Sequence, residues 1–166
     1  INNKASSFDF PDNKVLFAWA GIGQHQDLIN PMSIMVYAGG VANGGQAAEP
    51  YIIKSLKAED VFEVEGESTK LMKVLNPSTA NEIRDMMKYN VTSYYGSWKF
   101  PGLDIGGKTG TAQHDDRDSD LWFTGFLDDD DHPYAFVCYI YNEDADSTSR
   151  AGGIMNEVLQ YIVAND

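Results

Sequence analysis

The sequence predicts an α+β fold in which an antiparallel sheet is flanked by helices. Three strand-like segments, residues 107–113, 121–127 and 134–141, follow one another in the second half of the chain. The last two are joined by residues 128–133, whose run of aspartates and a proline is typical of a turn and predicts an antiparallel hairpin. The chain then closes with apolar residues at helical spacing: Ile154, Met155, Val158, Leu159, Ile162 and Val163.

Length and composition limit the classes of function that the chain can have. The 166 residues fit one domain, of which residues 1–14 are expected to be irregular, and 43% hydrophobic residues can fill a core. A net charge of −13 argues against nucleic acid as a partner, because binding phosphates needs clustered Lys and Arg. Cys138 is the one cysteine, which excludes an internal disulfide, and no apolar run is long enough for a membrane span.

The first half of the chain contains one clear helix. Residues 15–20 form a short apolar run whose type the sequence does not decide. Asn30 followed by Pro31 predicts an N-cap and a first helical residue, and residues 43–45, Asn-Gly-Gly, predict the end of that helix. The pair Gly39-Gly40 inside the helix disfavours it energetically and so indicates close packing or a bend.

The middle of the chain predicts two strands and a second helix. Residues 51–53 and 70–75 have the composition of strands. Thr79 and Glu82 form a capping box, which predicts that a helix opens there. Residues 89–107 contain glycine, proline and several aromatic residues, and we expect an irregular connection.

The most informative segment is Gly106-Gly107-Lys108-Thr109-Gly110-Thr111-Ala112-Gln113. Together with Gly102 it fits the spacing of a phosphate-binding loop, so a nucleotide-binding module using residues 102–109 is one hypothesis. Such a loop must follow a buried strand and open a helix, whereas this run continues as a β-rich segment. The structural context therefore decides this hypothesis.

The same segment also carries a family resemblance. Lys108-Thr109-Gly110 is a signature of penicillin-binding proteins and serine β-lactamases. Upstream stand residues 21–24, Gly-Ile-Gly-Gln, and residues 30–33, Asn-Pro-Met-Ser; downstream stand Trp122-Phe123-x-Gly125 and the closing helix. In this order, over residues 15–163, the chain resembles the transpeptidase domain of penicillin-binding proteins. The resemblance implies a β-lactamase/transpeptidase-like fold.

The resemblance also implies roles for the residues of this segment. Lys108 would face the active site and orient hydroxyl groups electrostatically. Thr109 and Thr111 would contact the carboxylate of the substrate or of penicillin, with Gln113 beside them in the substrate site. The backbone N–H of Thr111 would be one donor to the oxyanion, and Gly110 would keep the strand surface open.

Two motifs of the family are missing from the chain. It needs Ser-x-x-Lys for the nucleophile and Ser/Tyr-x-Asn for a second motif, and neither occurs among the 166 residues. Ser147 comes nearest, but Arg150 stands where the lysine would be, and a guanidinium cannot act as a base. Both motifs precede Lys-Thr-Gly in the family. The chain therefore resembles the C-terminal portion of the domain, and we expect it to be inactive alone.

The implied parent is a D,D-transpeptidase that cross-links peptidoglycan by serine acyl transfer, without a metal or cofactor. Its partners would be the stem peptide, β-lactam antibiotics and the missing N-terminal half of the domain; self-association of this chain is a further expectation. It would work in the bacterial cell envelope, outside the cytoplasmic membrane, anchored by an upstream segment. A β-lactam sensor or a β-lactamase of the same fold is the alternative.

Metal binding has little support in the sequence. Asp116-x-Asp118-x-Asp120 mimics the opening of a calcium loop, but Leu121 and Leu127 occupy the positions that need Gly and Glu. The three histidines lack the spacing of zinc ligands. We therefore expect a solvated loop at residues 116–120 and no metal site.

Overall fold

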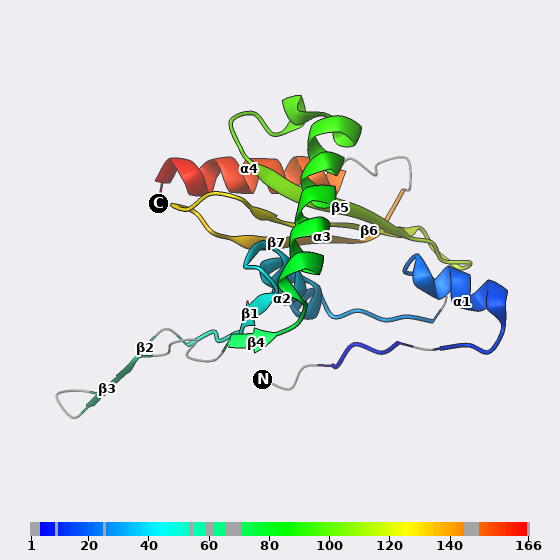
Figure 1. Cartoon of the computed structure of the whole chain (residues 1–166), viewed down its shortest axis with the longest axis horizontal. Coiled ribbons are helices and arrows are strands. Elements are labelled where there is room, and N and C mark those ends of the chain that lie inside the picture. Colours follow the sequence, from blue (N-terminus) through cyan, green and yellow to red (C-terminus); the bar gives the residue numbers. More distant parts are fainter. Residues whose placement is uncertain are drawn as a thin grey trace.

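The computed structural model describes residues 4–8, 10–24, 26–53, 55–58, 62–65, 71–144 and 150–165. At its centre lies an antiparallel sheet of three strands in the order β5-β6-β7 (Figure 1). The strands are β5 (Ile105–Ala112), β6 (Ser119–Leu127) and β7 (Ala135–Glu143). The three predicted strands and the hairpin that joins the last two are confirmed.

Helices cover both faces of this sheet. The C-terminal helix α4 (Arg150–Asn165) buries Ala151, Met155 and Leu159 in one cluster with Phe136 of β7. The helix α2 (Pro31–Ala42) packs on the opposite face, since Gly39 lies against Ala135, and neighbouring residues of a strand point to opposite sides. The sheet is thus flanked by helices, as the α+β prediction expects (Figure 1).

The core lies between α4 and the sheet. Its buried members come from all three strands, from α4 and from the segment before β5: Val91, Phe100, Ile105, Leu121, Phe123, Leu127, Phe136, Ala151, Met155 and Leu159. The rings of Phe100 and Phe123 stack with their centroids 5.5 Å apart. Aromatic packing therefore holds the inward residues of β6 in place, and β5 is held with them because it pairs with β6.

The first half of the chain forms two helices. The undecided run at residues 15–20 is part of α1 (Lys14–Gly21). The helix α2 begins as predicted, with Asn30 as its N-cap and its side chain accepting a hydrogen bond from the N–H of Met32 at 2.8 Å. Close packing explains the glycine pair, because a Cβ on Gly40 would lie 2.5 Å from Cγ2 of Val74.

The short strands differ from the prediction. The strands β1 (Gln46–Ala48) and β4 (Leu71–Lys73) form one antiparallel pair, and β2 (Ser55–Ala58) and β3 (Phe62–Glu65) form another. The strand predicted at 51–53 is wrong: these three residues are exposed and pair with no strand of the described chain. The strand predicted at 70–75 is shorter, and residue 70 lies outside the described residues.

The second predicted helix and the connection after it also differ from the prediction. The helix α3 (Pro77–Tyr89) begins two residues before the predicted capping box, because proline at its first position already has a helical φ. The connection is not irregular. It continues α3 as a π-helix, η1 (Asn90–Gly96), and a 3₁₀ turn, η2 (Ser97–Lys99), before β5 begins. No helix in the described part of the chain is long and apolar enough to cross a membrane.

Candidate active site

The strand β5 has one open edge. Its residues pair with β6 on one side only within the described chain. The carbonyl of Asp104 accepts the N–H of Asp128 at 2.7 Å, on the β6 side. Backbone groups alternate along a strand, so those of Gly107, Thr109 and Thr111 point the other way, to the open edge.

Side chains from η1 cover the beginning of this edge. The N–H of Thr109 donates to the hydroxyl of Tyr95 at 3.1 Å, and that hydroxyl lies 3.1 Å from Oγ1 of Thr109. The amide of Asn90 lies 3.4 Å from the carbonyl of Gly107. The carbonyl of Gly107 and the N–H of Thr109 are therefore hydrogen-bonded by side chains of the protein itself.

Two further side chains reach the end of the edge. Nζ of Lys108 donates to the carbonyl of Thr109 at 2.6 Å. Nε2 of Gln24 donates to the carbonyl of Thr111 at 2.9 Å. Gln24 follows Gly23, whose φ of +79° turns the chain away from α1 and directs it back to β5.

The N–H of Thr111 is a free backbone donor near the end of this edge. It points the same way as the carbonyl that Gln24 binds, and no acceptor in the described parts of the chain is bonded to it. The ammonium of Lys108 and the hydroxyl of Thr109 lie beside it on the same edge. A free backbone donor next to a cation and a hydroxyl group is an arrangement that binds an oxyanion or a carboxylate.

The structure brings most of the predicted site residues together. Lys108, Thr109 and Thr111 present their polar groups along the open edge. Gly110 lies between Thr109 and Thr111, and a Cβ atom added to it would contact the side chain of Trp122. Gln113 lies just beyond the end of β5 and is exposed.

Sequence reasoning missed the three residues outside β5 whose side chains contact this edge: Gln24, Asn90 and Tyr95. Gln24 stands in the Gly-x-Gly-Gln run that carries part of the resemblance, and this run was the available signal. Tyr95 lies in a segment read as irregular, and no motif marks it.

The loop after β5 is held by one carboxylate. Asp120 accepts two hydrogen bonds from Arg117, at 2.6 and 2.8 Å, and lies 3.1 Å from Nε2 of His114. The hydrogen bonds from Arg117 hold the pKa of Asp120 well below its ordinary value, against the opposing effect of burial. Its oxygens are therefore occupied by protein donors, and no group of three metal-binding side chains occurs in the described ranges.

The phosphate-loop hypothesis is wrong. Lys108 and Thr109 lie in the middle of β5, and the eight residues of this strand are followed by a loop and by β6. A phosphate loop needs these two residues at the start of a helix, where the N–H groups and the dipole bind the phosphates. Residues 102–109 provide no such N-terminus.

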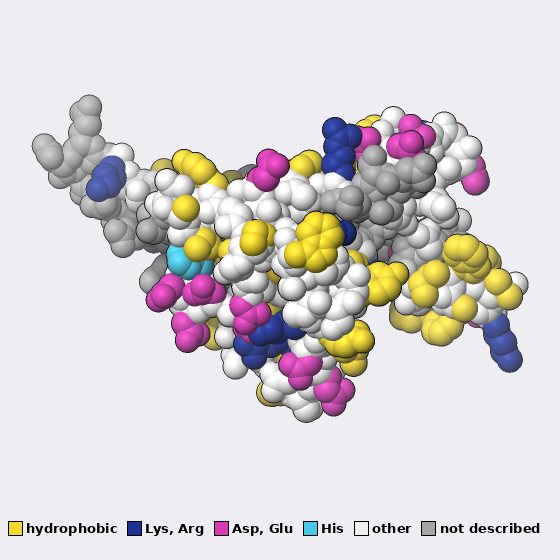
Figure 2. Space-filling view, turned by 90° about the horizontal axis from the view of Figure 1, so that it is seen from above, with side chains coloured by type: hydrophobic (Ala, Val, Ile, Leu, Met, Phe, Trp, Pro, Cys, Tyr) yellow, Lys and Arg dark blue, Asp and Glu magenta, His cyan; other side chains and the backbone are white. Residues whose placement is uncertain are grey.

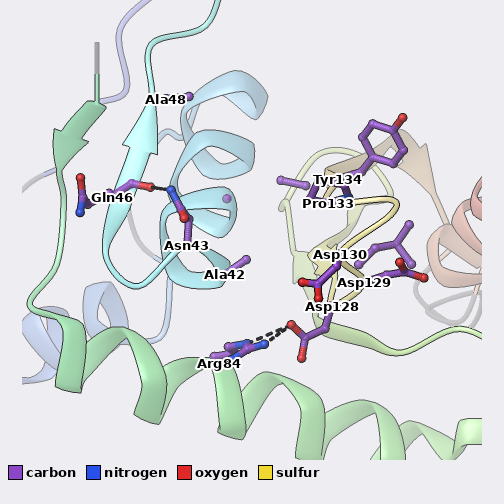
Figure 3. Close-up of a pocket in the computed structure, with 13 residues that line it drawn as sticks. Ala42, Asn43, Gln46, Ala48, Arg84, Asp128, Asp129, Asp130, Pro133 and Tyr134 are labelled. Atoms are coloured by element: carbon purple, nitrogen blue, oxygen red, sulfur yellow. Dashed lines mark hydrogen bonds and ion pairs between the residues drawn. The ribbon is translucent and has the colours of Figure 1, made fainter. Parts of the chain in front are cut away.

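A cavity of about 470 Å³ lies away from the open edge, between the end of α2 and the β6–β7 turn (Figure 3). Arg84 of α3 forms an ion pair with Asp128 there, and Lys88 binds Asp128 and Asp104 at 2.5 and 2.8 Å. Burial raises the pKa of Asp128, but the hydrogen bonds from Arg84 and Lys88 outweigh it and lower that pKa. These ion pairs hold α3 in contact with the β6–β7 turn.

The comparisons with known proteins agree with the fold. Residues 3–160 match the family model described as the penicillin binding protein transpeptidase domain. The chain belongs to this family of transpeptidase domains. It is 29% identical over 143 residues to "Peptidoglycan D,D-transpeptidase PbpA" of Mycolicibacterium smegmatis, which covers 82% of the chain and 28% of that protein.

Solved structures show the same fold. A ceftriaxone acyl-enzyme complex of penicillin-binding protein A from M. tuberculosis aligns with a TM-score of 0.76 and 24% identity, over 93% of this chain and 37% of that one. The D,D-transpeptidase domain of a peptidoglycan glycosyltransferase from Eggerthella lenta aligns with a TM-score of 0.62 and 27% identity, over 76% and 31%. The chain thus spans less than a third of the length of the curated relative and just over a third, or less, of these structures.

Proposed function

We propose that this chain is the Lys-Thr-Gly portion of a peptidoglycan D,D-transpeptidase and that it binds the stem peptide and β-lactams along the open edge of β5. The observation that carries the proposal is the free N–H of Thr111, with the groups of Lys108 and Thr109 beside it. The similar proteins support it, since the curated relative is a D,D-transpeptidase and one similar structure is a β-lactam acyl-enzyme.

The chemistry assigns a role to each group on this edge. In acyl transfer, a serine attacks the carbonyl of the terminal D-Ala-D-Ala bond, and negative charge develops on the carbonyl oxygen. The N–H of Thr111 donates to that oxygen, while Lys108 adds a positive charge that stabilises it. The hydroxyls of Thr109 and Thr111 donate to the terminal carboxylate of the substrate.

The nucleophile comes from another part of the protein. None of the serines of the chain is followed by Lys at the third position, so this portion supplies the anion-binding side of the site and another portion supplies the serine and its base. The side chains of α1 support this division, because most of its apolar residues are exposed (Figure 2). The whole enzyme acts in the cell envelope, outside the cytoplasmic membrane, where its substrate is found.

A labelling experiment tests the proposal. Full-length protein incubated with a fluorescent penicillin should form a covalent adduct, and the 166-residue chain alone should form none. Lys108→Ala should reduce labelling of the full-length protein by at least a hundredfold, because a charge next to the reacting centre is lost. Lys99→Ala, at a lysine that lies over the ring of Trp98 instead, is the matched control and should label normally. Full-length protein that is never labelled would exclude the proposed function.

A further inference from the structure

Tyr95 contacts the candidate site through its hydroxyl. Asn90 and Tyr95 stand five residues apart in η1, which is the spacing of the hydrogen bonds in a π-helix, and both reach the open edge of β5. The Tyr95 hydroxyl binds both the N–H and Oγ1 of Thr109, so Oγ1 of Thr109 lies on the open edge too. One phenol thus controls the direction of the Thr109 hydroxyl.

The proton on each oxygen follows from elementary rules. An N–H can only donate, so the Tyr95 oxygen accepts from Thr109 N–H and keeps its own proton to donate. The nearest acceptor is Oγ1 of Thr109, at 3.1 Å. The phenol is more acidic than an aliphatic hydroxyl and is therefore the better donor of the two. With Tyr95 donating, the Thr109 proton is free to point away from the protein.

A carboxylate ligand requires this arrangement. An ionised carboxylate only accepts hydrogen bonds, so Thr109 must donate to it and must itself accept from a third group. The chain from Tyr95 to Thr109 to the carboxylate is then continuous, and each bond in such a chain polarises the next.

We propose that Tyr95 is a positioning residue: its hydroxyl donates to Thr109 and thereby presents the Thr109 hydroxyl as a donor to the carboxylate of the ligand. This inference rests on the proposed function, because it concerns a carboxylate bound at the same edge. Tyr95 itself does not touch the ligand. Its effect reaches the ligand only through Thr109.

The hydroxyl can be removed without removing the ring. The Tyr95 ring lies edge-on to Phe123, with centroids 6.3 Å apart, and packs against the core cluster. Phenylalanine preserves these contacts, so Tyr95→Phe isolates the hydroxyl. Tyr94→Phe is the matched control. Tyr94 is 81% exposed, and its hydroxyl has no hydrogen bond to β5 in the described residues.

The test compares two ligands on the full-length protein, benzylpenicillin and its methyl ester, which lacks the carboxylate charge. Tyr95→Phe should lower the second-order acylation rate of benzylpenicillin about tenfold and leave that of the ester unchanged, since only the former needs the Thr109 donor. Tyr94→Phe should change neither rate. In a Thr109→Ala background, Tyr95→Phe should have no further effect, because its route to the ligand is gone.

The outcomes separate the inference from the proposed function. If the wild-type protein is acylated and Tyr95→Phe slows both ligands equally, or slows neither, the positioning role is refuted while the proposed function stands. An additive effect of Tyr95→Phe in the Thr109→Ala background would refute it as well. If neither ligand acylates the wild-type protein, the proposed function itself fails.

Discussion

At the residue scale, Asp120 organises the loop that follows the strand of the site. Besides Arg117 and His114, it accepts the backbone N–H of Asn142 at 3.1 Å, and Asn142 has a φ of 55° that few side chains other than Asn tolerate. Arg117 also lies over the ring of Tyr141, 4.4 Å from its centroid. One nearly buried carboxylate therefore ties the β5–β6 loop to the end of β7.

Replacing Asp120 by Asn should destabilise this chain by about 2 kcal/mol at pH 7, because the bonds from Arg117 lose their charged acceptor. The pKa of Asp120 is lowered by folding, so its ionised form stabilises the fold above about pH 4 and this contribution is lost as the pH falls further. Urea unfolding should show the difference between Asp120→Asn and wild type shrinking from pH 7 to pH 3.

The control for this prediction is Asp118→Asn, at an exposed carboxyl two residues away. It should change the free energy of unfolding little at either pH. An equal loss for Asp120→Asn at both pH values would contradict the argument, because the loss would then come from packing and not from charge.

At the candidate site, the sequence could mark only residues that lie close together in the chain. Lys108, Thr109 and Thr111 fall within four positions of β5, so one strand carries all three, and their roles stay predictions. Gln24 is separated from its partner Thr111 by 87 positions, and Tyr95 from Thr109 by 14. Such pairs depend on how η1 and the segment after α1 lie against β5, which the sequence pattern does not contain.

At the element scale, α2 and α3 begin alike in sequence and differently in structure. Both have Asn before Pro, and both asparagines are N-caps. The Asn30 side chain accepts the N–H of Met32 and donates to the carbonyl of Lys4 at 2.8 Å, whereas the Asn76 side chain makes no capping bond. The same dipeptide therefore contributes a side-chain cap to one helix only.

Asn30→Ala should lower the free energy of unfolding by about 1 kcal/mol, the typical cost of losing an N-cap. Asn76→Ala is the matched control and should cost only a few tenths of that, since the side chain bonds nothing at the helix end. Urea unfolding of the two variants, followed by tryptophan fluorescence, measures both. Equal losses would show that the cap of Asn30 contributes nothing beyond the Asn-Pro pair.

Strands were predictable where an apolar sequence run also has a neighbouring strand to pair with. The β6 and β7 strands each have a strand beside them and a helix to cover them, so their apolar runs become strands. Residues 51–53 have an equally apolar run but no strand pairs with them in the described chain. A strand needs a hydrogen-bonding neighbour, and composition alone does not supply one.

At the scale of the whole molecule, apolar surface gathers around α1, at one end of the molecule (Figure 2). Phe10, Val15 and Ile22 are 72%, 64% and 74% exposed, and the rings of Phe10 and Phe17 lie 6.2 Å apart. A contiguous apolar patch of this kind marks an interaction surface. We expect the rest of the transpeptidase domain to cover it in the full-length protein.

The isolated chain should therefore self-associate through this patch. Ile22→Glu should lower the apparent molecular mass at micromolar concentration in analytical ultracentrifugation, because a charge is placed where apolar side chains would meet. Met86→Glu, at a residue of α3 that is 61% exposed and lies apart from α1, should leave the mass unchanged. A chain that stays monomeric at all concentrations would contradict the prediction.

The side chains along β5 also bear on aggregation. An exposed strand edge with free backbone groups is a template on which another chain can add a strand. Here side chains of Asn90, Tyr95, Lys108 and Gln24 occupy the carbonyls of Gly107, Thr109 and Thr111 and the N–H of Thr109. A foreign strand would have to displace these side chains before it could pair, whereas a ligand that needs a single backbone donor still finds one at Thr111. The edge is thus protected from amyloid-like pairing and remains accessible to such a ligand.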